Sequence, residues 1–314
     1  MITPSQPDGA SPPPPLGLST SALVLLTAAL WGGTAVAIKY SVDTLPPVAV
    51  AAIRFGLAAV FLAGWCGLYR HRIGLRWDQV PAALTIGIML FIQISLFNIG
   101  VHWSNASHGT LLINTYVIWV VAIEHFATKG DRMTLMKSSG LCLAGLGAAL
   151  AVLLSARAPT LGVAGNAPSV VGDIALVVSA AVLGIKMVYT KASVHHVEPT
   201  VLMFWQHTIG TVLFVLYSYC YEPLSTLTWS AFTIPTILSL FYQGILVGGI
   251  CFALQAILLR RHSATQISVF SFSTPLFGVM AAIIGRNEPL SPWLLMSGVC
   301  VAAGTYLVNR RATS

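Results

Sequence analysis

Long apolar runs alternate with short polar segments along almost the whole chain. Each run holds about 20 residues, the length of helix that crosses the hydrocarbon core of a bilayer. The runs are continuously apolar and do not alternate, so they predict helices and not the strands of a barrel. The predicted fold class is an all-α membrane protein with ten transmembrane helices. We place these spans at residues 19–40, 45–69, 79–101, 107–127, 132–154, 170–192, 198–219, 232–259, 264–284 and 290–309.

One apolar phrase occurs twice, as SGLCLAG at residues 139–145 and as SGVCVAA at residues 297–303, which lie 158 positions later. In the earlier part of each half an offset of 152 aligns Gly32 with Gly184. The same offset aligns Lys39 with Lys191 and Pro47 with Pro199. These matches predict two copies of one five-helix unit. Because five is an odd number, the second copy must enter the membrane from the opposite side, so the repeats are inverted.

The repeat fixes the predicted domain organisation. Residues 1–18 form a Pro-rich tail that we expect to be disordered, because it lacks the positive segment that opens a secretory signal. The first five-helix repeat spans 19–154, a linker spans 155–169, and the second repeat spans 170–309. Residues 310–314 form a short cytoplasmic tail.

Composition supports membrane insertion, and charge gives its direction. The 314 residues are 56% hydrophobic and only 8% charged, with a mean hydropathy of +0.82, whereas soluble domains carry about 25% charged residues. With a cytoplasmic N-terminus, eleven Lys and Arg residues fall at inner loops and three at outer ends. This excess predicts that both termini are cytoplasmic. The net charge of +7 therefore reflects orientation, and we expect no nucleic-acid partner.

Inverted repeats favour a transporter, because one packing arrangement and its flipped copy give two states, each open to one side of a midplane site. A duplicated but inert scaffold is the alternative. The expected partners are a small-molecule substrate and the lipid bilayer, and we expect a monomer. No spacing typical of a metal site occurs, so neither a metal nor another cofactor is expected.

Two stretches carry a family resemblance. LLRRHSATQISVFSFSTPLFGVMAAIIGRNEPLSPW (258–293), and ALWGGTAVAIKYSV (29–42) followed by Arg54, resemble EamA-type members of the drug/metabolite transporter superfamily. The resemblance covers residues 20–309 and is greatest to the aromatic amino-acid exporter branch. In the first repeat, Val117 and Gly130 stand where Pro275 and Glu288 stand in the second. The resemblance implies export of amino acids or similar metabolites, by alternating access, from the cytoplasm across the bacterial inner membrane.

Candidate residues for the substrate pathway come from two spans that the repeat relates. In the fourth span, spacing predicts one helical face that mixes polar and aromatic side chains. Its members are His108, Leu112, Thr115, Tyr116 and Trp119. Their counterparts in the ninth span are Gln266, Phe270, Ser273, Thr274 and Phe277. Ordinary helix packing is an equally weighted alternative, because hydroxyls commonly bond between membrane helices.

Amides deep in apolar sequence need hydrogen-bond partners that hydrocarbon cannot supply. Gln93, Gln243, Gln255 and Asn114 are such residues, and together with Trp31 they join the predicted pathway. Small residues and a proline are candidates for gating or for close helix packing, of which packing is the favoured role. They are Gly32, Gly33, Gly184 and Pro275.

Three charged or titratable residues lie within spans, namely Arg54, Lys186 and His207. Such residues are functional candidates by default. Arg54 could meet a substrate carboxylate or could pair with Asp43 or Asp173, and we favour the pair. For His207 we expect a neutral, hydrogen-bonded imidazole.

Further alternatives concern the activity itself. No acidic residue falls at a predicted midplane, and proton-driven carriers relay protons through buried carboxylates, so we expect uniport. Export of other metabolites or of lipophilic toxic compounds is the alternative within transport. An intramembrane enzyme is a remote alternative, since Ser107 and His108 are adjacent and do not face each other on a helix. We expect no enzymatic activity.

Overall fold

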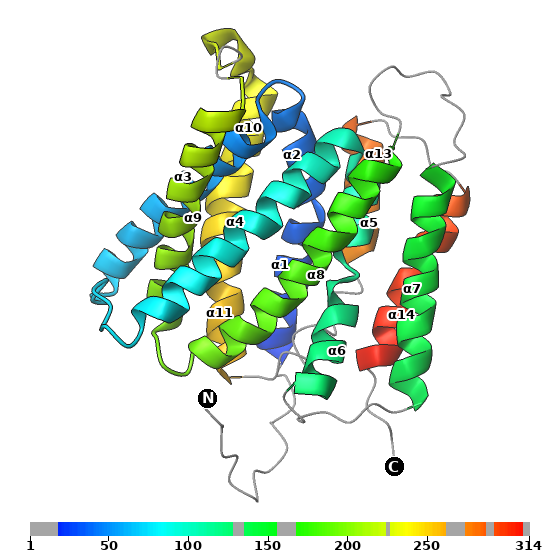
Figure 1. Cartoon of the computed structure of the whole chain (residues 1–314), viewed down its shortest axis with the longest axis horizontal. Coiled ribbons are helices and arrows are strands. Elements are labelled where there is room, and N and C mark those ends of the chain that lie inside the picture. Colours follow the sequence, from blue (N-terminus) through cyan, green and yellow to red (C-terminus); the bar gives the residue numbers. More distant parts are fainter. Residues whose placement is uncertain are drawn as a thin grey trace, which may run out of the picture.

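The computed structural model describes residues 18–127, 135–155, 168–223, 227–261, 274–286 and 292–309. All regular elements in these ranges are helices, and they pack into one bundle (Figure 1). The terminal segments 1–17 and 310–314 lie outside the described residues, as do residues 156–167 of the predicted linker.

Each half of the chain supplies a series of helices. The first half contains α1 (Leu18–Gly32), α2 (Thr34–Val42), α3 (Pro47–Leu68), α4 (Val80–Trp103), α5 (Ala106–Ile113), α6 (Tyr116–Ala127) and α7 (Leu135–Ser155). The second half begins with α8 (Val170–Ser193), α9 (Pro199–Tyr221), the short 3-10 helix η2 (Trp229–Ala231) and α10 (Ile234–Phe241). It continues with the π-helical segment η3 (Tyr242–Cys251), α11 (Phe252–Arg261), α13 (Thr274–Arg286) and α14 (Pro292–Asn309).

Seven helical stretches among the described residues are long and apolar enough to cross a membrane. They are Leu18–Val42, Pro47–Leu68, Val80–Trp103, Ala106–Ile123, Val170–Ser193, Pro199–Tyr221 and Ile234–Arg260. Shorter apolar helices, Ser138–Gly147 and Leu295–Gly304, fall within the predicted fifth and tenth spans. The predicted ninth span is described only from Thr274 onward. An integral membrane protein is therefore supported, whereas the count of ten spans stays a prediction.

Three predicted spans are interrupted near their centres, which the apolar pattern did not predict. The first divides at Gly33 between α1 and α2, and the fourth divides at Asn114–Thr115 between α5 and α6. The eighth changes from α-helix to π-helix over η3. Helix breaks at membrane depth are tolerated where the backbone is buried in protein or lines a cavity. These three interruptions therefore indicate where a cavity could lie.

The recurring phrase of the sequence packs against its own copy, because α7 and α14 lie against each other. A Cβ atom built on Gly147 of α7 would lie 2.8 Å from the Ser297 carbonyl oxygen and 2.9 Å from Cys300 Cβ of α14. The Ser297 hydroxyl donates a hydrogen bond to the Gly147 carbonyl. Small residues are thus required in this phrase so that two helix backbones can touch.

A second close approach occurs twice, each time between a helix of one half and a helix of the other. A Cβ atom on Gly32 would lie 2.7 Å from Phe277 Cβ and 3.0 Å from the Thr274 carbonyl oxygen. A Cβ atom on Gly184 would lie 2.6 Å from Trp119 Cβ and 3.0 Å from the Tyr116 carbonyl oxygen. The offset of 152 relates the two glycines, and the offset of 158 relates their neighbours. The α1–α13 contact and the α8–α6 contact are therefore formed by repeat-related residues.

A third close approach of helices also occurs twice. It brings α3 against η3, and it brings α9 against α4. A Cβ atom on Gly244 of η3 would lie 2.8 Å from Leu57 Cβ of α3. A Cβ atom on Gly87 of α4 would lie 2.7 Å from Ile209 Cβ of α9, and Ile209 is 152 positions after Leu57. Close backbone packing thus joins the two halves in matching ways.

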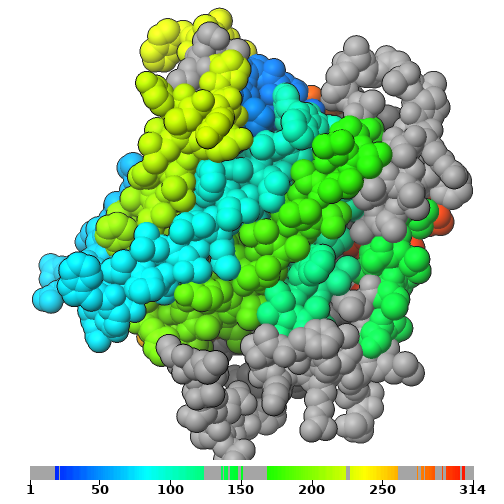
Figure 2. All heavy atoms as spheres, in the orientation of Figure 1, coloured from blue at the N-terminus to red at the C-terminus, as the bar shows by residue number. Residues whose placement is uncertain are grey.

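One face of the bundle carries the apolar exterior expected of a membrane protein. Figure 2 shows α4 in cyan and α8 in green side by side across this face. Leu84, Ile88 and Ile92 recur every four residues along α4, and all three are exposed. They form a stripe of lipid-facing side chains.

Polar side chains gather where α2 ends and α3 begins, at the top of Figure 1, which we call the upper end. Asp173, in the first turn of α8, is fully buried and accepts a 2.7 Å hydrogen bond from the Ser104 hydroxyl. Its other carboxylate oxygen lies 2.9 Å from His108 Nδ1. Asp43 pairs with Arg286 at 2.5 Å and lies 3.8 Å from Lys39 Nζ.

Two further contacts tie helix ends together there. The buried Lys39 ammonium donates hydrogen bonds to the carbonyl oxygens of Val101, His102 and Ser104, at 3.4, 3.2 and 3.2 Å. It thereby satisfies the open carbonyls at the end of α4. The Glu222 carboxylate accepts 2.8 Å hydrogen bonds from the amides of Val48 and Ala49, which begin α3. The upper end is thus held by charged groups that cross between helices.

The glycine contacts give a first prediction. Gly184→Leu should destabilise the fold by about 1–3 kcal/mol, because the new side chain would overlap the α6 backbone. Gly64→Leu is the matched control, since a Cβ atom at Gly64 of α3 would meet nothing within 4 Å. The measurement is the temperature at which detergent-purified protein loses its monodisperse peak. Equal melting temperatures for the two variants would contradict the close approach.

The upper-end cluster gives a second prediction. Asp173→Ala should cost about 3–5 kcal/mol, because it leaves His108 and the Ser104 hydroxyl buried without their partner. Asp43→Ala is the comparison, and we expect about 1 kcal/mol at most, since Asp43 is partly exposed. The same thermal assay ranks the two variants, and the reverse order would refute this account of the cluster.

Candidate functional site

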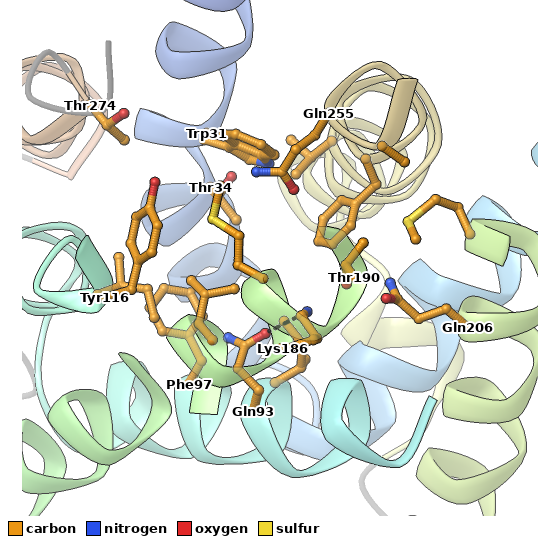
Figure 3. A pocket seen from close by; sticks show the side chains of 18 of the residues that line it. Trp31, Thr34, Gln93, Phe97, Tyr116, Lys186, Thr190, Gln206, Gln255 and Thr274 are labelled. Atoms are coloured by element: carbon orange, nitrogen blue, oxygen red, sulfur yellow. Dashed lines mark hydrogen bonds between the residues drawn. The ribbon is translucent and has the colours of Figure 1, made fainter. Parts of the chain in front are cut away.

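A cavity of about 120 Å³ lies among helices of both halves (Figure 3). Its wall is largely apolar, with a few polar and charged side chains. The lining residues are Trp31, Thr34, Arg54, Gln93, Ile94, Phe97, Ile113, Asn114, Tyr116, Leu183, Lys186, Met187, Thr190, Met203, Gln206, Val247, Phe252, Gln255, Ala256, Leu259 and Thr274.

The three helix interruptions surround this cavity. Trp31 and Thr34 lie on either side of the Gly33 break, and Asn114 lies at the break that separates α5 from α6. Val247 belongs to the π-helical segment η3. Irregular backbone therefore occurs where it faces a cavity, as it does in transporters that bind substrate between broken helices.

Several pairs of repeat-related positions occur among the residues that line the wall. Thr34 and Lys186 are 152 positions apart and both face the cavity, and so do Arg54 and Gln206. Tyr116 and Thr274, which are 158 positions apart, form a third such pair. Figure 3 shows Lys186 on one side of the hollow and Thr34 across from it. Each half thus contributes the same set of positions, with different chemistry at each.

The structure brings many of the predicted pathway residues into this wall. They are Trp31, Gln93, Asn114, Tyr116, Gln255 and Thr274. Two of the predicted intramembrane charges, Arg54 and Lys186, join them. That these residues contact substrate stays a prediction.

Other predicted residues lie elsewhere. His108 pairs with Asp173, the Thr115 hydroxyl donates to the Leu112 carbonyl at 2.7 Å, and Gln243 donates to Ser41 Oγ at 3.1 Å. Trp119 and Phe277 pack at the glycine contacts described above, which is the packing role expected for Gly32 and Gly184. Gln266, Phe270 and Ser273 lie outside the described residues. Gly33 lies at the first helix break, and Pro275 in the first turn of α13.

The predicted face of the fourth span is not one continuous face. The spacing assumed an unbroken helix from His108 to Trp119, but the helix ends at Ile113 and a new one begins at Tyr116. The break changes the direction in which the later side chains point. As a result, Tyr116 lines the cavity, whereas Leu112 is buried in the core.

The favoured pairing of Arg54 with Asp43 or Asp173 is wrong. Asp43 pairs with Arg286 and Lys39, and Asp173 pairs with His108 and Ser104. The Arg54 side chain is almost fully buried, and its Nε and Nη1 atoms have no hydrogen-bond partner among the described residues. Its guanidinium carbon lies 4.6 Å from the centre of the Phe55 ring.

Lys186 belongs to the second half of the chain, and the groups that hold its ammonium are neutral. Its ammonium donates a 3.2 Å hydrogen bond to Gln93 Oε1, drawn as a dashed line in Figure 3. Gln93 is fixed in turn by Ser179. The Gln93 Nε2 donates to Ser179 Oγ at 3.2 Å, and the backbone carbonyl of Gln93 accepts from the Ser179 hydroxyl at 2.7 Å. The Lys186 ammonium also lies 5.3 Å from the centre of the Phe252 ring.

His207 does not line the cavity, and its hydrogen-bond partners are compatible with the neutral imidazole that the sequence led us to expect. Its Nε2 lies 2.8 Å from the Gly248 carbonyl oxygen, which can only accept. Its Nδ1 lies 3.3 Å from the Gln206 amide nitrogen, which can only donate. One ring nitrogen therefore carries a proton and the other does not. The His207 ring packs edge-on against Phe55 and Phe252, which are the rings that Arg54 and Lys186 contact.

Sequence reasoning missed several lining residues. Thr34 and Gln206 could have been found, because they are the repeat counterparts of Lys186 and Arg54. Thr190 lies one helical turn beyond Lys186 on α8 and could have been found in the same way. Phe252 carries no such signal, because its place depends on the π-helical turn that precedes it.

The cavity can hold a small solute that has an apolar body and a group that binds to cations. No Asp or Glu lines it among the residues that the structure describes. In the same part of the chain, no group of three His, Cys, Asp or Glu side chains could hold a metal ion. The chemistry available at the wall is therefore hydrogen bonding, aromatic contact and positive charge.

Known proteins resemble this chain over most of its length. An uncharacterized transporter of Bacillus subtilis, YoaV, is 20% identical over 279 residues, a match that covers 88% of this chain and 92% of that protein. Proteins named probable amino-acid metabolite efflux pump in Salmonella typhimurium and Escherichia coli are each 24% identical, over 91% of this chain and 93% of each relative.

A solved crystal structure shares the fold, with a TM-score of 0.68 and 19% sequence identity, over 92% of this chain and 98% of that chain. The profile of the EamA-like transporter family matches the chain twice, at residues 18–153 and 170–310. Because these two matches together cover nearly the whole sequence, the chain belongs to the EamA-like transporter family.

Proposed function

We propose that the protein exports amino acids and similar carboxylate-bearing metabolites from the cytoplasm by alternating access. The observation that carries this proposal is the cavity between the two halves, whose apolar wall holds Arg54 and Lys186. Ligand sites of this kind combine apolar walls with a few placed polar groups, and the polar groups select the ligand. A carboxylate with an apolar side chain is complementary to such a wall.

Alternating access requires two halves that can exchange roles. The glycine contacts of α1 with α13 and of α8 with α6 use matched positions of the two halves. In Figure 1, α2 ends at the upper end, and α8 begins at that same end, so the matched helices run in opposite directions. These features support inverted repeats that rock about the cavity.

The substrate is proposed from charge and from relatives. Two relatives are named for efflux of amino-acid metabolites. Lipophilic cations are the alternative within transport, but two cationic side chains in the wall would repel them. The cavity therefore favours carboxylates over cationic toxic compounds.

Orientation and energetics complete the proposal. The excess of Lys and Arg in the predicted inner loops supports cytoplasmic termini, and we propose the bacterial inner membrane as the location. Among the residues that the structure describes, the wall of the cavity contains no carboxylate of the kind that relays protons in driven carriers, and we propose uniport on this ground. Substrate then moves down its own gradient.

A transport assay tests the proposed activity. Purified protein in liposomes preloaded with one unlabelled amino acid or carboxylate metabolite should accumulate the labelled compound by counterflow. Tetraphenylphosphonium, a lipophilic cation, should give no signal above protein-free liposomes. Counterflow of the cation alone would overturn the proposal.

A second assay tests uniport. An imposed pH gradient of one unit, in either direction, should leave the initial rate of carboxylate uptake unchanged when the internal and external substrate concentrations are fixed. The uptake is measured with and without an ionophore that collapses the gradient. A severalfold stimulation that the ionophore abolishes would show proton coupling instead.

A further inference from the structure

We propose that the cavity is selective for net organic anions, so that its substrates are carboxylates that lack a compensating ammonium group. Arg54 and Lys186 would form the binding site for the carboxylate. This inference rests on the proposed transport function and, among the amino acids and carboxylate-bearing metabolites named there, selects the carboxylates without a free amine over the amino acids.

The first line of evidence is the unsatisfied state of Arg54. A guanidinium offers five N–H donors in a planar fork that matches a carboxylate. Two of its nitrogens, Nε and Nη1, are buried without a hydrogen-bond partner among the described residues. Burying a cation costs a great deal of free energy unless a partner compensates it. The side chain lines the cavity, and a rotation of the guanidinium would turn these donors toward a carboxylate bound there.

The second line of evidence is the position of Lys186. It reaches the same cavity from α8, whereas Arg54 reaches it from α3. Among the described residues, Lys186 contacts the neutral Gln93 amide and the Phe252 ring. Aromatic faces hold cations in place without neutralising them. Two like charges thus share one apolar space, and an anion between them would relieve the repulsion.

The third line of evidence is that nearby carboxylates are already engaged elsewhere. Asp43 and Asp173 are paired at the upper end, and Glu222 caps α3 there. Glu198 accepts a 2.8 Å hydrogen bond from the Val201 amide at the start of α9. Among the acids whose side chains the structure describes, Asp78 remains, and it pairs with Arg76 on the surface. None of these is left to neutralise the cations of the cavity.

The rest of the wall determines the remainder of the ligand. Ile94, Phe97, Leu183, Met187 and Met203 are apolar and would surround a hydrophobic body. A zwitterion would bring its ammonium into this space beside two cations, with no described carboxylate to receive it. The like-charge repulsion is large in a medium of low dielectric constant. An anion of the same shape avoids this cost and keeps the attraction.

The experiment uses three ligands that share a phenylethyl body and differ only in charge. They are 3-phenylpropionate, an anion, phenylalanine, a zwitterion, and phenethylamine, a cation. Binding to the full-length protein in detergent is measured by the rise in melting temperature as each ligand is titrated. We expect 3-phenylpropionate to bind about tenfold or more tightly than phenylalanine, because the ammonium group of phenylalanine is repelled by the two cations. Phenethylamine should produce no shift.

Variants then assign the selectivity to the two cations. Arg54→Met and Lys186→Met should each weaken binding of 3-phenylpropionate by about 10–100-fold, the value of a hydrogen bond to a charged group. Without ligand, neither variant should melt below the wild type, because an uncompensated charge is removed. Arg54→Lys keeps the charge and should recover part of the affinity. Arg72→Met, which removes an exposed charge outside the cavity, is the matched control and should bind like the wild type.

The outcomes separate this inference from the proposed function. Equal binding of phenylalanine and 3-phenylpropionate, unchanged in the two methionine variants, would overturn anion selectivity and leave amino-acid export standing. Preferential binding of phenethylamine would overturn both. Loss of folding in Arg54→Met and Lys186→Met without ligand would show that the cations are structural, and it too would refute the inference.

Discussion

Hydrocarbon supplies no hydrogen-bond acceptor, so every charge inside this bundle must be compensated by the protein or by what the protein binds. At the upper end the protein compensates itself, since Asp173 meets His108 and Asp43 meets Arg286. At the cavity the described part of the chain does not, and two nitrogens of Arg54 have no hydrogen-bond partner within it. This contrast separates the part of the molecule that fastens helices from the part that awaits a ligand, and the proposed selectivity follows from it.

The position of the cavity follows from backbone packing. Gly32 and Gly184 allow α1 and α8 to touch α13 and α6, so the two halves meet through matched contacts. The helix breaks at Gly33 and at Asn114–Thr115 lie beside those contacts. Regular helices packed this closely would leave no space between them. The breaks open the wall, and they turn side chains such as Asn114 toward the cavity.

The repeat made the fold and part of the site predictable from the sequence, because matched positions make matched contacts. Gly184 was thereby placed at a close approach, and Arg54 and Lys186 were singled out by charge alone. The break after Ile113 was not predicted, because one Asn-Thr pair within an apolar run is also compatible with an unbroken membrane helix, and it divided the face proposed from His108 to Trp119. The pairing of Arg54 failed for another reason. The position of a residue along a span predicts its depth in the membrane. It does not predict the direction around the helix in which the side chain points.

The most direct test of the account is a crystal structure of the protein with 3-(4-bromophenyl)propionate, whose bromine atom can be located by anomalous scattering. The account predicts a carboxylate within hydrogen-bond distance of both Arg54 and Lys186, with the bromine among the apolar side chains of the cavity. A ligand bound elsewhere, or a protein carboxylate paired with Arg54 in the substrate-free crystal, would contradict it.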